Sequence, residues 1–260
     1  MDDALYIAAT GMQAHQRSVE TIANNLANIS TPGYKKSRVN FADMVYRNLA
    51  PTPPGLDQPN AAPAWLGTGV TIASLAKVYS QGEIKQTGRA MDVAINGEGF
   101  IEASAEDGAL VYGRGGTLSV DKDGMLCLAD GYPINPPIHV GTGAAAITIG
   151  KDGTVQVTPS DGAAPFEAGR IDLVRFADQA GLVGLGNNLY RASEQSGDAI
   201  AYRTAEDGAG SLAQGYVESS NVSLAEEMVN LTIAQRAYES SIKVIQAADE
   251  MLAMSNNLRK

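Results

Sequence analysis

Two seven-residue repeats of apolar residues, one near each end of the chain, constrain the fold more than any other feature. From Leu5 to Ile29 there is no proline and one glycine, and apolar side chains recur every seven residues. From Val217 to Lys260 there is neither glycine nor proline, and a second repeat follows Ser223. Such repeats are typical of helices that pack along a seam. The sequence therefore predicts a long helix at each end, paired in a coiled-coil-like layer.

The residues of the two repeats and their apolar neighbours are the predicted subunit-interface residues. They are Leu5, Met12, Val19, Ile22, Leu26, Ile29, Leu224, Met228, Leu231, Tyr238, Ile242, Ile245 and Leu252. Thr31-Pro32-Gly33 predicts a sharp stop to the first helix, and Ser223 with Glu226 predicts a capping box at the start of the second. Two helices alone bury too little apolar surface to be stable, so we expect them to become ordered when neighbouring subunits cover them. The alternative is that both helices pack on a single globular core.

The sequence of the middle of the chain predicts an antiparallel β-rich domain. Together with the two terminal helices, this predicts an α+β fold for the chain. Residues 46–66 are rich in proline and predict a stiff, extended segment. Beyond them, short β-like runs alternate with turn signals, and Lys-Asp-Gly separates two runs at both 118–128 and 147–157, as in a hairpin. We therefore expect a helical inner domain of residues 1–45 with 215–260, an extended segment of 46–66 and a β-rich outer domain of 67–214.

Charge and composition exclude several functions. The net charge is −10, and most of it falls within residues 51–213, so nucleic acid is an unsuitable partner. We expect no membrane insertion, since the sequence has no apolar run of 18 residues, and we see no cleavable signal peptide at the start. A single cysteine, Cys127, with two histidines, His15 and His139, offers no recognisable metal site or catalytic triad. We therefore expect no enzymatic activity, no metal and no cofactor.

A run at the end of the first helix carries a family resemblance. Residues 25–34 read Asn-Leu-Ala-Asn-Ile-Ser-Thr-Pro-Gly-Tyr, which resembles the signature of the bacterial flagellar rod and hook proteins. The motif residues are Asn25, Leu26, Asn28, Thr31, Gly33 and Tyr34. Residues 214–222 and 226–239 are similar to the C-terminal signature of that family, and residues 66–70, 80–82, 92–100 and 188–190 resemble landmarks between the two ends. In length and in its proline-rich stretch the chain resembles the distal rod subunit.

The resemblance implies a structural subunit that polymerises into a straight helical tube and serves as drive shaft and export channel. It implies as partners further copies of the chain, other rod subunits, the hook protein, the periplasmic and outer-membrane ring proteins, and the flagellar export apparatus. The implied location is the periplasm-spanning rod of the basal body, reached through the type III export apparatus with an uncleaved N-terminus. We expect the motif residues to fix a bend and subunit contacts rather than to perform chemistry.

Two other functions remain open at this point. The chain could be a proximal rod subunit of the same family. It could also be an oligomeric β-domain that binds glycan, although Trp65 is the only tryptophan and no aromatic platform supports this reading. For the distal rod we further expect residues 47–66 to lie between neighbouring subunits and hold the tube straight.

Overall fold

The computed structural model describes residues 2–44, 46–48, 65–105, 107–128, 131–160, 162–204 and 210–257. The chain forms two compact units, each built from segments far apart in the sequence. The first, which we call the helical unit, comprises residues 1–26, 37–76 and 223–260. The second, the β unit, comprises residues 27–36 and 77–222.

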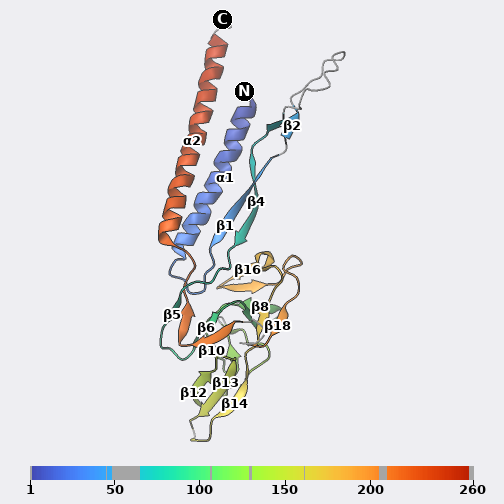
Figure 1. Cartoon of the computed structure of the whole chain (residues 1–260), viewed down its shortest axis with the longest axis vertical. Helices are drawn as coiled ribbons and strands as arrows, with labels where there is room; N and C mark the ends of the chain where they lie inside the picture. Colours follow the sequence, from blue (N-terminus) through green and yellow to red (C-terminus); the bar gives the residue numbers. More distant parts are fainter. Residues whose placement is uncertain are drawn as a thin grey trace. The chain divides into compact units, whose positions relative to one another are not determined.

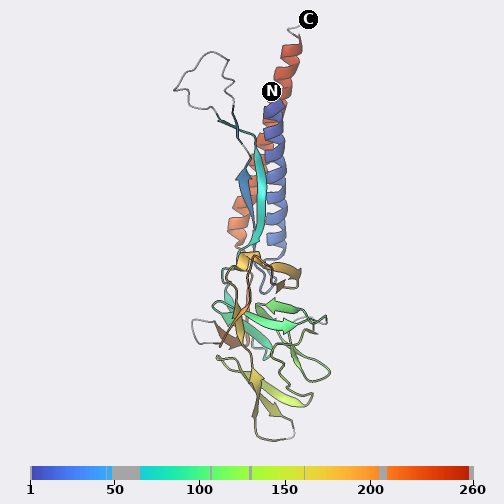
Figure 2. The same cartoon turned by 90° about the vertical axis from the view of Figure 1, so that its right-hand side faces the viewer.

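The helical unit contains two long helices, α1 (Asp2–Ala27) and α2 (Leu224–Asn257). They run antiparallel and side by side, so that α1 begins at the end of the unit where α2 finishes (Figure 1, Figure 2). Beside them lie two short two-stranded sheets, β1 (Ser37–Asp43) with β4 (Val70–Lys77), and β2 (Tyr46–Asn48) with β3 (Trp65–Gly67). The pairing of β1 with β4 places this two-stranded ribbon along α1 (Figure 1).

The first helix ends close to the predicted position. It stops at Ala27, two residues before Ile29, and the chain then turns through Thr31-Pro32-Gly33. Gly33 takes a φ of 72°, in the left-handed region that favours glycine. The proline and this glycine together explain why the helical repeat does not continue.

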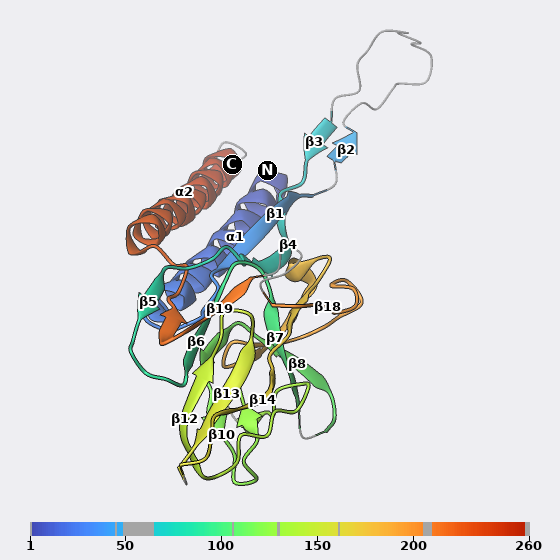
Figure 3. The ribbon, with the colours of Figure 1, turned by 60° about the horizontal axis from the view of Figure 1, so that its bottom comes forward.

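The β unit is built from antiparallel pairs of short strands (Figure 3). Its largest sheet has the order β16-β17-β8-β7-β15-β18, and smaller sheets have the orders β19-β6-β9, β12-β13-β14, β10-β11 and β20-β5. The strands are β5 (Ile84–Gln86), β6 (Asp92–Asn96), β7 (Phe100–Ser104), β8 (Leu110–Gly113), β9 (Gly115–Thr117), β10 (Ser119–Val120), β11 (Leu126–Cys127), β12 (Ala144–Ile149), β13 (Thr154–Pro159), β14 (Phe166–Arg170), β15 (Leu173–Arg175), β16 (Val183–Gly186), β17 (Leu189–Arg191), β18 (Ile200–Tyr202), β19 (Ser211–Gln214) and β20 (Tyr216–Glu218). A short 3-10 helix, η2 (Gln179–Gly181), precedes β16.

Both predicted hairpins are confirmed. The pair β10–β11 brackets Gly124, and the pair β12–β13 brackets Gly153. These glycines have φ values of 75° and 85°, which side chains with a Cβ rarely adopt. At Gly153 a Cβ would also lie 2.2 Å from the backbone oxygen of Ile171, so the turn packs directly against the next strand connection.

Two apolar clusters fill the β unit. The larger is aliphatic and includes Val93, Ile101, Leu126, Val155 and Leu173, all essentially inaccessible to solvent. The smaller is aromatic and joins Phe100, Tyr112, Phe176 and Tyr190, with Tyr79 packed against it. The Tyr112 and Phe176 rings meet edge to face at a centroid distance of 4.8 Å. Five of the fifteen aromatic residues of the chain thus pack together in one part of the β unit.

A buried carboxylate stabilises the start of β6. Asp92 accepts hydrogen bonds from the hydroxyls of Thr87 and Thr117 at 2.6 and 2.7 Å, and from Nε of Arg89 at 2.8 Å. Burial by itself would raise the pKa of Asp92, but these three bonds and the charge of Arg89 outweigh it and hold that pKa below its ordinary value. The carboxylate is therefore charged in the folded chain.

The α+β fold class with two terminal helices around an antiparallel β-rich middle is confirmed. The boundaries of the compact units differ from the predicted domains in three places. Residues 67–76 lie with the helices because β4 pairs with β1, whereas residues 27–36 and 215–222 lie in the β unit, where β20 pairs with β5. Most of the proline-rich segment, residues 49–64, lies outside the described residues. Neither described helix has an apolar stretch that could cross a membrane.

Candidate assembly surfaces

The surface of α2 that faces α1 carries a seven-residue pattern. Ala234 and Ala248 are buried on it, and Leu231, Tyr238, Ile245 and Leu252 are partly buried. Small residues allow the helices to approach closely, since a Cβ built on Gly11 of α1 would lie 3.7 Å from the hydroxyl of Ser241. Four of the predicted α2 residues therefore lie on the α1-facing surface.

The remaining predicted residues are distributed differently. Leu224 and Met228 are each 54% exposed, and Ile242 is partly buried. Beside Leu231, Tyr238, Ile245 and Leu252, a second line of residues seven apart faces α1. It consists of Glu227, Ala234, Ser241 and Ala248, each one residue before the predicted line that contains Met228 and Ile242. On α1, Ile22 is buried and Leu5, Met12, Val19 and Leu26 are partly buried, while Ile29 lies partly buried in the turn after the helix.

A second apolar surface of α2 is open to solvent. It consists of Val229, Ile233, Val244 and Met251, with exposed fractions between 47% and 60%. At about 100° per residue these four side chains fall within about 60° of arc, so they form one line along the helix. We call it the outer stripe. Leu224 and Met228 lie on the other side of the α1-facing surface, so that apolar side chains occur on three sides of α2.

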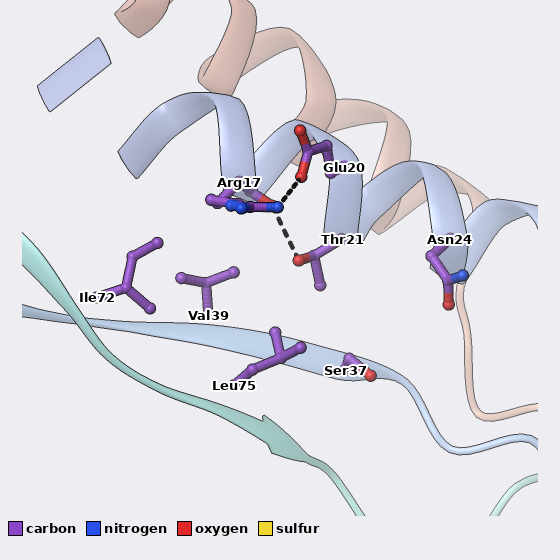
Figure 4. A pocket seen from close by; sticks show the side chains of 8 residues that line it. All are labelled: Arg17, Glu20, Thr21, Asn24, Ser37, Val39, Ile72 and Leu75. Atoms are coloured by element: carbon purple, nitrogen blue, oxygen red, sulfur yellow. Dashed lines mark hydrogen bonds and ion pairs between the residues drawn. The ribbon is translucent and has the colours of Figure 1, made fainter. Parts of the chain in front are cut away.

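A groove of about 410 Å³ runs between α1 and the β1–β4 ribbon. Val39, Ile72 and Leu75 stand on the strands, and Arg17, Glu20, Thr21 and Asn24 form the wall on α1 (Figure 4). The Arg17 and Glu20 side chains pair at 2.8 Å along the helix. The groove thus has an apolar floor and a polar rim, and Leu75 on its floor is 64% exposed.

Asn25 of the motif joins three parts of the helical unit. Its side-chain amide donates to the Ser37 carbonyl and accepts from the Ser37 N–H, both at 2.9 Å. This is the pair of hydrogen bonds that the backbone of an adjacent β-strand would make with Ser37. The same amide nitrogen donates to Glu227 of α2 at 3.2 Å. Asn25 and Glu227 are both buried, so the bonds are shielded from water. The motif asparagine therefore holds α1, β1 and α2 together.

The later motif residues lie in the β unit and shape its N-terminal turn. Thr31 donates its hydroxyl proton to the Asn28 side chain at 3.1 Å, and the Gly33 N–H donates to the Glu218 carbonyl at 2.7 Å. Tyr34 is buried, and the Lys77 ammonium lies 4.9 Å from the centre of its ring. These contacts hold the chain in a turn after α1, and the expected subunit contacts of the motif stay a prediction.

A buried charge cluster lies beside the motif. The Glu218 carboxylate accepts from Nζ of Lys35 at 2.6 Å, from the Gly82 N–H at 2.7 Å and from the Arg114 guanidinium at 3.2 and 3.3 Å. All three charged side chains are nearly inaccessible to solvent. Burial lowers the pKa of Lys35, and the charge of Arg114 lowers it further, although the hydrogen bond to Glu218 raises it. One carboxylate therefore compensates two buried cations.

The other N–H groups of the two cations donate hydrogen bonds to backbone carbonyls. Lys35 donates to the Ser80 carbonyl at 2.8 Å, and Arg114 donates to those of Gly97 and Gly99 at 3.0 and 2.9 Å. Buried ionic groups are tolerated in proteins when they are paired and hydrogen-bonded in this way. The cluster joins the segment after α1, the loop before β5, the β6–β7 turn and β20 into one structure.

The Asn221 side chain links two backbone segments of the β unit. Its side-chain oxygen accepts from the Lys36 N–H at 2.7 Å, and its amide nitrogen donates to the Val78 carbonyl at 2.7 Å. One side chain therefore bridges two separate backbone segments, which is a structural and not a chemical task.

Within the described ranges no group of three or more histidine, cysteine or acidic side chains is placed to hold a metal ion. His15 is partly buried and its ring lies 6.3 Å from that of Phe41, which agrees with a packing role. His139 is exposed, and Cys127 is a buried free thiol.

Comparisons with known proteins cover the chain from end to end. Residues 5–35 match the family described as "Flagella basal body rod protein", residues 94–157 the "Flagellar hook protein FlgE/F/G D1 domain" and residues 213–258 the "Flagellar basal body rod FlgEFG protein C-terminal" family. The flagellar basal-body rod protein FlgG of Buchnera aphidicola subsp. Schizaphis graminum is 41% identical over 260 residues, which are 99% of this chain and 100% of that protein. The chain belongs to the flagellar basal-body rod protein family.

Two other members of the rod family help to place the chain within it. FlgG of Borreliella burgdorferi is 40% identical over 99% of this chain and 98% of its own length. The rod protein FlgF of Caulobacter vibrioides is 32% identical over 96% of this chain and 95% of its own length. The resemblance to the distal rod protein is therefore confirmed, and the comparisons do not support the glycan-binding alternative.

For this rod-family chain, sequence reasoning missed the charge cluster, the Asn221 bridge and the α1–ribbon groove. Lys35 and Glu218 are 183 residues apart, and Arg114 and Glu218 are 104 apart, so no local spacing connects them. The available signal was position, because Lys35 follows Tyr34 of the motif directly, and Glu218 and Asn221 lie within the run that resembles the C-terminal signature.

Proposed function

We propose that this chain forms the distal part of the flagellar rod by polymerising into a straight helical tube, which acts as drive shaft and export channel. Membership of the rod family supports a structural subunit. The observation that carries the proposal further is the outer stripe of α2, where four large apolar side chains are about half exposed in the single chain. Apolar side chains that line up on an exposed side of a helix are a common mark of a protein–protein contact.

Apolar surface and charge favour one order of layers in the proposed tube. The terminal helices form the inner layer around the channel, because they expose apolar surface that neighbouring copies can cover. The β unit forms the outer layer, because it is stabilised by two buried apolar clusters of its own and the sequence it spans carries most of the negative charge. The role is structural and not catalytic.

The other partners belong to the same proposal. They are other rod subunits, the hook protein, the periplasmic and outer-membrane rings as a bushing, and the flagellar export apparatus. The location that goes with them is the periplasm-spanning rod, reached by flagellar export with an uncleaved N-terminus.

Electron microscopy of the purified protein tests the proposal. We expect straight tubes with a central channel for the wild-type chain and for Gln246→Asp, and none for Val244→Asp. The two variants introduce the same charge within one turn of α2, but Gln246 lies away from the outer stripe. A wild-type chain that stays monomeric at every concentration would contradict the proposal.

A further inference from the structure

Within their own chain, the four side chains of the outer stripe stay about half exposed. Gly11 of α1, which abuts Ser241, defines the side of α1 that α2 covers. At about 100° per residue, Arg17, Thr21 and Asn24 lie about 80–140° around α1 from Gly11. The groove beside them therefore opens on a different side of α1 from its own α2.

The groove and the stripe match in length. The α1 wall runs from Arg17 to Asn24, seven residues or about 10 Å of helix. Val244 and Met251 on the outer stripe are also seven residues apart and span the same distance. Ser240 and Ala247, which fall between the large side chains on that side of α2, are small enough for the helix to approach the strands closely.

The two surfaces also match in chemistry. The groove floor of Val39, Ile72 and Leu75 is apolar, as is the stripe. Along one edge of the stripe stand two exposed cations, Arg236 and Lys243, again seven residues apart. The groove presents the Glu20 carboxylate at its rim, about half exposed and bonded to Arg17. A helix laid in the groove could thus bury its stripe and bring a cation to this carboxylate.

We propose that the α1–ribbon groove receives the outer stripe of α2 from a second copy of this chain. Stripe and groove are different surfaces of one helical unit, so each copy uses its groove toward one neighbour and its stripe toward another. Such a heterologous contact does not pair two copies face to face, and it continues into an open helical assembly unless the rotation closes. The inference rests on the proposed self-assembly and adds which two surfaces meet.

Disulfide cross-linking in assembled tubes tests the contact. In a Cys127→Ala background, Leu75→Cys is combined with Val244→Cys or with Met251→Cys, and tubes are oxidised and run on a non-reducing gel. We expect a ladder of cross-linked multimers. The matched controls combine Leu75→Cys with Leu224→Cys or Met228→Cys, which are as exposed as the stripe residues but lie on the other side of α2.

The expected difference is at least about fivefold in the cross-linked fraction between stripe and control pairs. Tubes that form with equal or stronger cross-linking of the control pairs would overturn this contact and leave the proposed function intact. If neither the Cys127→Ala chain nor the wild type forms tubes under any condition, both the contact and the proposed function would be overturned. A cross-link confined to single chains, without multimers, would likewise refute the contact between copies.

Discussion

Replacing Glu218 by glutamine is the most informative single change in the β unit. The carboxylate accepts from Lys35, Arg114 and the Gly82 N–H, and all of these groups are buried. Glutamine keeps one acceptor oxygen but removes the negative charge and adds donors that point toward two cations. Glu218→Gln therefore leaves Lys35 and Arg114 facing each other without compensation.

The expected cost is large. Removing one partner of a buried ion pair typically costs about 3–5 kcal/mol. A domain of this size is stable by about 5–15 kcal/mol, so the change removes a substantial part of the free energy of unfolding. With a urea m-value of about 2 kcal/mol/M, the unfolding midpoint should fall by about 2 M. Lys35→Met should cost less, because Arg114 still compensates Glu218.

Urea unfolding of the monomer, followed by near-UV circular dichroism, measures this effect. The buried cluster of Tyr79, Tyr112 and Tyr190 supplies the signal and lies in the β unit. Glu83→Gln is the matched control, since its ion pair with Lys85 at 3.5 Å is exposed and should contribute less than about 1 kcal/mol. A Glu218→Gln midpoint as close to wild type as that of the control would refute the reasoning.

Three further outcomes are expected. The low pKa of Asp92 contributes stability that is complete above about pH 5 and is lost as the pH falls through the folded-state value, so urea midpoints should drop less between pH 5 and pH 3 in Asp92→Asn than in wild type. Gly153→Ala should destabilise the β unit by about 3 kcal/mol or more and Gly162→Ala by about 1 kcal/mol, because both have positive φ but only the first Cβ would strike a backbone oxygen; equal thermal shifts would argue against this. In the isolated monomer, amides of α1 and α2 should exchange with solvent faster than those of β6 and β7, and protected helix amides would show that neighbours are not needed to order them.

Local patterns in the sequence were sufficient for the elements that depend on local physics. The seven-residue repeats predicted both helices, and Lys-Asp-Gly predicted both hairpins, because helix periodicity and turn chemistry are encoded within a few neighbouring residues. The end of the first repeat at Ile29 likewise located the end of α1 to within two residues, and the proline and glycine after Thr31 marked the turn that follows.

The sequence could not show which positions of the repeats face inward in one chain. Met228 and Ile242 are as apolar as Leu231, and it is tertiary contacts, such as Gly11 with Ser241 and Asn25 with Glu227, that place the Ala234–Ala248 line toward α1. It also could not show that residues 27–36 belong to the β unit, because the Lys35–Glu218 pair depends on chain segments 183 residues apart. Single charged residues carry no periodic signal, so such a cluster becomes visible only in three dimensions.

The division of residues 27–36 from the rest of the N-terminal segment has a kinetic consequence. The β unit holds segments from both ends of its sequence, and its buried Lys35 has no compensating carboxylate until Glu218 arrives. Contacts of such high contact order form late, since a long loop must close before any of them is gained. A chain delivered one end first therefore remains incomplete over most of its length, and folding of the β unit finishes only when nearly the whole chain has emerged. The same carboxylate that stabilises the finished subunit thus delays its completion, which agrees with the proposal that the chain is exported before it assembles.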